Sequence, residues 1–393
     1  NFFESDEWKE VYNKVGSPHF CVFGGGYGEN TNVLGDTHLN IEMSERGSLS
    51  DYDIKEGEEY KHFVSGYSVM DFVGGGYSGK VEGDTHISGN GGGFCRRVFG
   101  GGFYNSVNAT NVDIKAIDCH DVFGGGLMGD VLKSTTVNIG SETTPSTGFT
   151  NKDIYIHGSI YGGNDVSGYV NVELDNNGYF KDNGGSGTRI NIYGGRIDGN
   201  VYGAGNGDYL YALDKKGNTK VTVNEDYPFN PNDPNSETAS LVYTVPMRDN
   251  MPSYKAASDA AKIVNINSWR PLTNKVNILI KGVSESDTVT IKGDVYGGGN
   301  SATVQKVQNA YARTNVTTGA ITIDIGNHTR IGRVFMGCNG DALFTASEDN
   351  DFMNKFQRLN GDVDDYTKEL NLADSIDWVN DPSNKGISTL WLS

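Results

Sequence analysis

The stretch Val122-Phe123-Gly124-Gly125-Gly126-Leu127-Met128-Gly129-Asp130-Val131 recurs in related forms from residue 22 to residue 340. Each copy begins with an apolar residue followed by an aromatic or apolar one, and a glycine-rich cluster comes next. Such internal repetition indicates one elongated body made of stacked units. The nine aligned pairs are Val22-Phe23, Phe72-Val73, Val98-Phe99, Val122-Phe123, Ile160-Tyr161, Ile192-Tyr193, Val201-Tyr202, Val295-Tyr296 and Val334-Phe335.

A second unit follows the early glycine clusters, with a valine, a short turn that often contains Gly-Asp-Thr, and then alternating apolar and polar residues. Residues 33–41, 81–87, 107–114 and 131–139 have this form. Alternation with a period of two is typical of a strand with one buried face. This unit therefore predicts one strand per repeat.

The length of the repeat distinguishes two all-β architectures. Gly74, Gly100 and Gly124 are separated by 26 and 24 residues, which suits three short strands and three turns. A propeller blade needs roughly 40 residues and is the alternative. The predicted fold class is an all-β parallel β-helix solenoid, with the right hand that parallel crossovers favour. Gly194 and Gly203 are too close for one coil, so one of them should mark a different corner.

The domain organisation follows from where the repeat stops. We expect an N-terminal helical cap at 1–20, β-helix coils at 21–206 and again at 276–340, and a C-terminal cap or the start of another module at 341–393. Residues 207–275 contain six of the nine prolines and predict a long loop insertion, with a short helix at 254–264. Insertions of this kind often carry the binding face of a repeat protein.

The formal charge of -18 argues against nucleic acid as a partner, because a phosphate backbone would be repelled. No apolar run reaches the 18 residues that a membrane helix needs, so no membrane insertion is expected. The chain begins at Asn1 rather than at methionine, so we expect a processed product in which a removed export signal would leave no trace. The strand-like residues 389–393 suggest that the natural protein continues.

Five aromatic residues of the insertion are candidates for ligand binding, because sugar rings pack on aromatic faces. The alternative, which we favour, is that they form the insertion's own small core. They are Tyr209, Tyr211, Tyr243, Tyr254 and Trp269.

Two histidines suggest a metal site. His38 and His86 follow Gly-Asp-Thr in neighbouring repeats, and with Asp36 and Asp84 they offer imidazole and carboxylate ligands. The simpler interpretation is a solvated polar ladder that Asn111 and Thr136 continue, and we favour it.

Two other glycine-rich patterns raise the question of a cofactor. The stretches at 162–165 and 205–208 are reminiscent of calcium-binding nonapeptide repeats, but the nine-residue period is absent. No Gly-Lys-Ser/Thr follows the glycine clusters, so we favour structural turns over phosphate-binding loops. We expect no cofactor, with calcium as the alternative.

Cys95 and Cys119 each precede a glycine cluster by the same interval, so they should be ladder neighbours that form either a disulfide or two stacked thiols. Asp118, Asp121 and Asp130 could join Arg96 and Arg97 in a polysaccharide-cleaving set. Solvated surface charge is the favoured interpretation, and no catalytic residue is assigned.

The run Val-Phe-Gly-Gly-Gly followed by Val-x-Gly-Asp-Thr-x-Ile resembles the glycine-rich coils of exported parallel β-helix proteins from gut bacteria, in the broad pectin-lyase-like class. The resemblance covers 21–206 and 276–340 and concerns the coils only. That class contains adhesin-like proteins, polysaccharide lyases and glycoside hydrolases. The pectinase motifs Asn-Thr-Asp, Gly-His-Gly and Arg-Ile-Lys are missing here.

The resemblance implies a secreted or cell-surface bacterial protein. We expect a structural, adhesin-like function with carbohydrate binding, and a glycan or a host or cell-surface protein as the partner. The alternative is a polysaccharide lyase or glycoside hydrolase, with substrate along one face of the β-helix.

Overall fold

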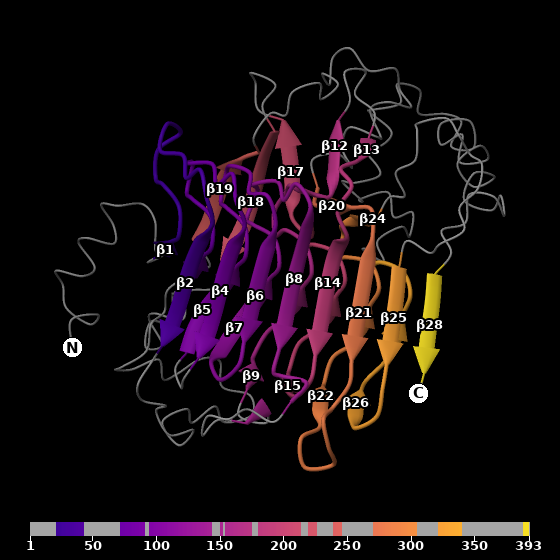
Figure 1. The fold of residues 1–393 in the computed structure, drawn as a ribbon. Coiled ribbons are helices and arrows are strands. Elements are labelled where there is room, and N and C mark those ends of the chain that lie inside the picture. Colours follow the sequence, from indigo (N-terminus) through magenta and orange to yellow (C-terminus); the bar gives the residue numbers. More distant parts are fainter. Residues whose placement is uncertain are drawn as a thin grey trace, which may run out of the picture.

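The computed structural model describes residues 21–42, 71–90, 94–143, 150–151, 154–174, 180–213, 219–225, 239–245, 270–304, 321–339 and 388–392. These residues form strands and turns and contain no α-helix. Their parallel strands stack into the sheets of a β-solenoid (Figure 1), which confirms the predicted all-β class. The helices expected within 1–20 and at 254–264 lie outside the described residues, as do residues 341–387 of the expected C-terminal cap or module. The right hand of the coil stays a prediction.

One long side of the solenoid is an eight-stranded parallel sheet, which faces the viewer in Figure 1. Every pair of neighbouring strands in it is parallel and in register. Its strands, in spatial order, are β2 (Thr37–Glu42), β4 (Thr85–Asn90), β6 (Thr110–Ile114), β8 (Ser134–Ile139), β14 (Gly187–Ile192), β21 (Val276–Ile280), β25 (Ile321–Ile325) and β28 (Ser388–Leu392).

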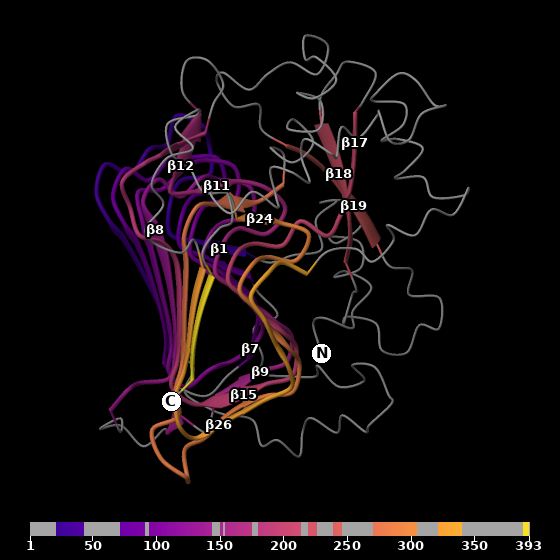
Figure 2. The ribbon, with the colours of Figure 1, turned by 90° about the vertical axis from the view of Figure 1, so that its right-hand side faces the viewer.

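The second long side is a twelve-stranded parallel sheet, which lies opposite the first in Figure 2. Its early coils contribute one strand each and its later coils two, because the single strand gives way to two short ones. The early strands are β1 (Cys21–Phe23), β3 (Asp71–Val73), β5 (Phe94–Phe99) and β7 (Asp118–Phe123). The later ones are β9 (Tyr155–Ile156), β10 (Ile160–Tyr161), β15 (Gly195–Ile197), β16 (Val201–Tyr202), β22 (Val289–Ile291), β23 (Val295–Tyr296), β26 (Thr329–Ile331) and β27 (Val334–Phe335).

A third, shorter side closes each coil. In the early coils it is a column of bridged valines, and in the later coils it widens into β11 (Tyr169–Val170), β20 (Leu272–Thr273) and β24 (Thr303–Val304). The coil has therefore resumed at Leu272, before the end that the sequence predicts for the insertion at 275. Antiparallel strands occur in two excursions, β12 (Val172–Leu174) with β13 (Phe180–Asp182), and β17 (Leu210–Leu213) with β18 (Thr219–Glu225) and β19 (Ala239–Thr244).

Eight of the nine predicted pairs stack in one continuous column of the twelve-stranded sheet. The prediction that Ile192-Tyr193 belongs to this column is wrong, because Ile192 ends β14 and pairs with Ile139 and Ile280 in the eight-stranded sheet. Gly194 and Gly203 accordingly mark two corners of one coil, as their short spacing predicts. Apolar residues followed by Gly-Gly can end a strand at either corner, which is why the pattern misleads there.

The first residue of each pair points into the solenoid and the second points out. Val98, Val122 and Ile160 are fully buried in the inner core beside the alternating valines and isoleucines of the eight-stranded sheet. The second residues form an outward ladder of stacked rings, Phe99, Phe123, Tyr161, Tyr202, Tyr296 and Phe335, with neighbouring centroids 4.6–5.1 Å apart. All of these rings except the exposed Phe335 belong to a second core, outside the coil, that also contains Val221 and Val245 of the insertion.

Glycine allows the coils to approach closely at the corner after each pair. A Cβ on Gly100 or Gly124 would collide with the carbonyl oxygen of the equivalent residue in the next coil. A threonine at the first or second position of each of the first five strands of the eight-stranded sheet donates its hydroxyl proton to this carbonyl across the coil boundary. The bonds run from Thr37 to Gly74, Thr85 to Gly100, Thr110 to Gly124, Thr135 to Gly162 and Thr188 to Gly203, at 2.5–2.7 Å.

We expect Thr135→Val to lower the free energy of unfolding by about 1–3 kcal/mol, because it leaves the buried Gly162 carbonyl without its hydroxyl donor. The neighbouring Thr136 points to solvent, so Thr136→Val should change stability by less than about 0.5 kcal/mol. Urea unfolding monitored by circular dichroism measures both variants. Equal effects at the two positions would contradict a structural role for the buried hydroxyl.

Candidate functional site

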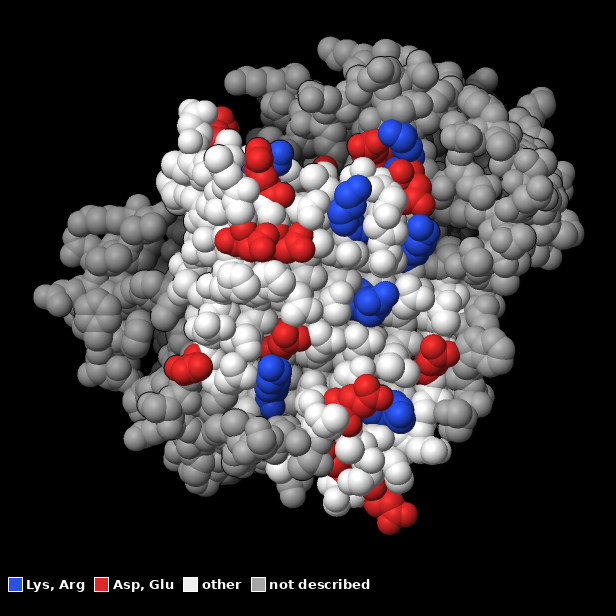
Figure 3. Space-filling model, in the orientation of Figure 1, with Lys and Arg blue, Asp and Glu red and all other residues white. Residues whose placement is uncertain are grey.

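The outer face of the eight-stranded sheet presents two columns of mostly polar side chains. One contains His38, His86, Asn111, Thr136, Arg189, Asn277 and Thr322, and the other contains Asn40, Ser88, Asp113, Asn138, Asn191, Leu279 and Asp324. We call these two columns the polar face. Figure 3 shows a broad, largely uncharged surface here, over which acidic and basic side chains are scattered.

Side-chain hydrogen bonds order the middle of the polar face. Asn191 donates to Asn138 at 2.7 Å, and Asn138 donates to Asp113 at 2.6 Å. Asn111 donates to the other oxygen of Asp113 at 2.8 Å. These amides are only partly buried, so they present fixed donors and acceptors at the strand spacing of ~4.8 Å. Such an array suits a ligand that itself repeats hydroxyl groups.

The N-terminal end of the polar face brings together three of the four predicted metal ligands. Ligand atoms of Asp36, His38 and His86 all lie within 4.8 Å of one another. The two imidazole rings are stacked, with centroids 4.6 Å apart and planes 8° apart. The carboxylate of Asp84, the fourth predicted ligand, instead accepts a hydrogen bond from Asn108 at 2.7 Å.

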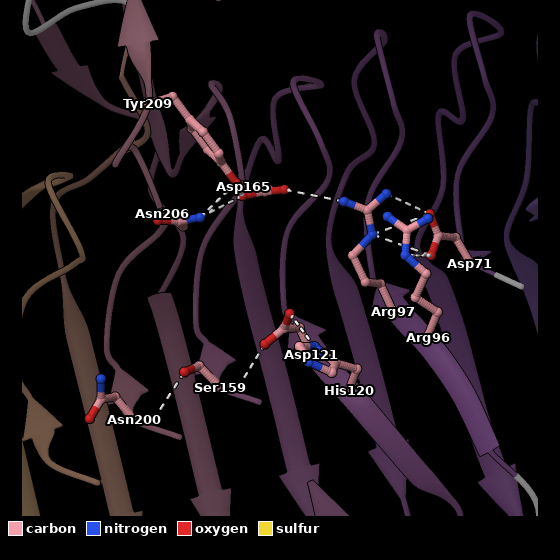
Figure 4. A network of polar contacts seen from close by, with 10 residues as sticks. All are labelled: Asp71, Arg96, Arg97, His120, Asp121, Ser159, Asp165, Asn200, Asn206 and Tyr209. Carbon is pink, nitrogen blue, oxygen red and sulfur yellow. Dashed lines mark hydrogen bonds and ion pairs between the residues drawn. The ribbon is translucent and has the colours of Figure 1, made fainter. Parts of the chain in front are cut away.

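A second polar cluster lies on the outer side of the twelve-stranded sheet (Figure 4). Its centre is Arg97, whose guanidinium donates to both carboxylate oxygens of Asp71, with a shortest distance of 2.6 Å. Arg97 also lies 3.9 Å from Asp165, and Arg96 lies 3.9 Å from Asp71. Asp71 and Asp165 are almost completely buried. Their charges are therefore matched within the protein, as buried ions require.

Asp165 links this cluster to the insertion. Its carboxylate accepts hydrogen bonds from the Tyr209 hydroxyl at 2.6 Å and from the Asn206 amide at 2.9 Å. Burial raises the pKa of Asp165 to about 6, because removal from water outweighs the opposing effects of Arg97 and of the two hydrogen bonds. Asp165 is thus an acid that titrates close to neutral pH.

His120 and Asp121 form the more accessible part of the cluster. The His120 Nδ1 atom lies 2.8 Å from the Asp121 carboxylate, and their side chains are 33% and 22% exposed. Burial disfavours the charge on His120, but the nearby Asp121 carboxylate outweighs it and raises the His120 pKa. Burial likewise opposes ionisation of Asp121, yet His120 and the backbone N–H of Ser159 lower its pKa. A histidine poised in this way can transfer a proton.

Asp71, Arg97 and Asp121 occupy the same position, directly before the apolar pair, in three successive coils. The next coils continue the column with Ser159, Asn200 and Asp294. The side chains of Asp121, Ser159 and Asn200 each accept the backbone N–H of the next residue in this column. The sequence analysis singles out Arg96, Arg97 and Asp121, includes Asp165 only in the calcium-like stretch 162–165, and misses Asp71 and His120. Aligning the residue before each pair would have found Asp71, whereas nothing in the repeat indicates that Asp165 pairs with Arg97.

The expected grouping of three aspartates around these arginines is only partly present. Asp118 is buried in β7, and Asp130 accepts a hydrogen bond from the backbone N–H of Tyr169 at 2.8 Å. The ion pairs of Arg97 go to Asp71 and Asp165 instead.

The described tyrosines of the insertion pack inward. Tyr209, Tyr211 and Tyr243 lie against the second core, and the Tyr211 hydroxyl donates to the Val166 carbonyl. Arg270 lies over the Tyr211 ring at 5.6 Å. Tyr254 and Trp269 lie outside the described residues. The three placed tyrosines thus attach the insertion to the coil.

An aromatic cluster that the sequence analysis does not single out lies at the first corner. Tyr27 is 76% exposed and stacks on Tyr77 with centroids 4.9 Å apart, and Tyr77 packs edge-on against Tyr104. Each of these tyrosines comes directly after, or one residue after, a glycine cluster. That position is the signal that could have revealed them.

Cys95 and Cys119 are paired neighbours in the twelve-stranded sheet, as predicted, and both are completely buried. Their sulfur atoms lie 2.9 Å apart as free thiols. Burial, together with the neighbouring Cys95, raises the pKa of Cys119 well above its usual value, so it is a protonated thiol at neutral pH.

The residues reminiscent of calcium loops have other contacts. Asn164 donates to the Gly129 carbonyl and accepts from the Gly126 N–H, while Asn206 donates to Asp165. Calcium stays a prediction. Within the described part of the chain, no helix is long and apolar enough to span a bilayer.

Comparisons of the chain with protein-family models, with curated proteins and with solved structures found no match.

The raised pKa of Asp165 has a consequence for stability. A carboxylic acid with a pKa raised in the folded state stabilises the fold fully below its unfolded pKa of 3.8, and this stabilisation is lost as pH rises through about 6. Relative to Asp165→Asn, which does not titrate, the wild type should gain roughly 2.4 kcal/mol in free energy of unfolding as pH falls from 7 to 4.

Urea unfolding of both proteins at several pH values measures this difference. The histidines contribute to both curves alike, so the difference isolates Asp165. A difference that does not change with pH would show that Asp165 has an ordinary pKa in the folded protein.

Proposed function

We propose that this chain is an exported, adhesin-like solenoid that binds carbohydrate without cleaving it, and that the polar face is its binding surface. The observation that supports this proposal is the in-register array of amide, hydroxyl and imidazole groups on seven successive strands. Neutral sugars are recognised through many such hydrogen bonds. A linear glycan that crosses the strands would meet equivalent groups at each coil.

The chemistry of the polar face suits a neutral polymer better than a charged one. Side chains with fixed hydrogen bonds, such as Asn138 and Asn191, lose little conformational entropy when a ligand binds. The exposed ring of Tyr27 offers an additional aromatic surface on which a sugar ring can pack. Export and surface display are inferred from the resemblance of the coils to those of exported β-helix proteins.

We expect the double variant Asn138→Ala, Asn191→Ala to bind glycan at least tenfold more weakly than the wild type, a loss of about 1.4 kcal/mol or more. A glycan array identifies the ligand, and isothermal titration calorimetry measures its affinity. Thr290→Ala, on the outer side of the twelve-stranded sheet, is the matched control and should bind like the wild type. Unchanged glycan affinity in the double variant would exclude the polar face as the binding surface.

The cluster around Arg97 favours a second candidate, a polysaccharide lyase or glycoside hydrolase. His120, whose pKa is raised, could act as an acid and Asp121, whose pKa is lowered, as a base. The two arginines beside them could neutralise a substrate carboxylate. The burial of Asp71 and Asp165 weighs against this candidate, because their charges are already matched by Arg97 and a substrate would have to displace them.

A degradation screen on the same protein sample distinguishes the two candidates. If the chain is an enzyme, its products should appear as new reducing ends or unsaturated sugars, and His120→Ala should slow their formation by about 100-fold or more. The double variant Asn138→Ala, Asn191→Ala should then cleave the polysaccharide at the wild-type rate. If the chain binds a polysaccharide on the array but cleaves none of them, the adhesin-like function is supported and the enzyme candidate is excluded.

A further inference from the structure

We propose that Asp36, His38 and His86 form a binding site for a divalent transition-metal ion of the Zn²⁺ type, which joins the first described coil to the second. Two imidazoles and one carboxylate converge there, with their ligand atoms within 4.8 Å of one another. Asp36 and His38 belong to one coil and His86 to the next, so a single ion would bridge the boundary between them.

The ligand set selects the class of metal. Imidazole nitrogen suits Zn²⁺, Cu²⁺ and Ni²⁺, whereas Ca²⁺ and Mg²⁺ prefer sites built from oxygen ligands. Zn²⁺ accepts three protein ligands with water in the fourth position. Asp36 and His38 are exposed and His86 is partly buried, so water can reach the ion.

The surrounding structure fixes the Asp36 carboxylate and the two strands that carry the histidines before any ion binds. The Asp36 carboxylate accepts the backbone N–H of Asp84 at 2.8 Å through one oxygen, and a carboxylate has a second oxygen that can bind a metal. Gly83 makes this contact possible, because a Cβ at that position would collide with the same carboxylate oxygen. Beneath the histidines, Thr37 and Thr85 anchor the two strands through their bonds to Gly74 and Gly100. Fixed second contacts of this kind are what orient metal ligands in proteins.

The position of the site along the solenoid matters as much as its chemistry. In the following coils the same column holds Asn111 and Thr136, so the histidine pair occurs only in the first two described strands of the polar face. Within the described residues, β2 is the edge strand of the eight-stranded sheet and pairs with β4 alone. An ion that binds the histidine pair only in the folded protein would stabilise the first described coil, and this stabilisation would rise with the logarithm of the ion concentration. This role does not depend on carbohydrate binding.

The test is titration of the EDTA-treated, dialysed protein with ZnCl₂ by isothermal titration calorimetry, with CaCl₂ as the contrast. We expect one Zn²⁺ per chain, no saturable Ca²⁺ binding to this site, and a Zn²⁺-dependent rise in melting temperature. His38→Asn and His86→Asn should each weaken Zn²⁺ binding at least tenfold and remove the rise. Asparagine already occupies this column at Asn111, so both variants should keep the fold.

Asp36→Asn should also weaken binding, because a neutral amide is a poorer ligand than a carboxylate. The control is His328→Asn, which changes an exposed histidine far along the chain at a positive φ that asparagine tolerates. It should bind Zn²⁺ like the wild type. Zn²⁺ binding that survives both His38→Asn and His86→Asn, or the absence of saturable Zn²⁺ binding by the wild type, would overturn the proposal.

Discussion

The bond from a threonine hydroxyl to a glycine carbonyl in the next coil is the contact on which this solenoid depends. It satisfies a buried acceptor at the corner where the chain leaves the twelve-stranded sheet, and it occurs five times in the described coils. Only glycine allows the two backbones to come close enough at this corner. The repeated Gly-Gly-Gly and Thr positions are thus two halves of one interaction, which explains why they recur together while the loops between them vary.

A solenoid normally has a single core, whereas this chain has two. Because strand residues alternate, the aromatic residue after each inward valine must point out, and the outward rings form a ladder that needs cover. The insertion provides part of that cover through Val221, Tyr211 and Val245. Asp165 and Tyr209 then close the boundary between coil and insertion with a polar contact. The outer side of the twelve-stranded sheet is therefore used to hold the insertion, while the polar face remains open to solvent.

Much of this architecture could be predicted from the sequence, because a regular repeat determines which residues are neighbours along a column. The parallel solenoid, the His38–His86 stack and the Cys95–Cys119 pair all follow from that rule. Contacts between columns do not follow. Arg97 reaches Asp165 from another coil and another side of the solenoid, and the alignment carries no information about such a pair. Ile192-Tyr193 failed for a related reason, since two corners of the same coil use similar residues.

The in-register parallel pairing also determines how the molecule would respond to mechanical force. In both large sheets the hydrogen bonds between coils run along the axis of the stack, across the strands. A pull along that axis places the same tension on every coil boundary, because the boundaries lie in series. Resistance to tension is then set by the weakest boundary rather than by the number of coils. A cross-link between the first two described coils would strengthen that one boundary and leave the others unchanged.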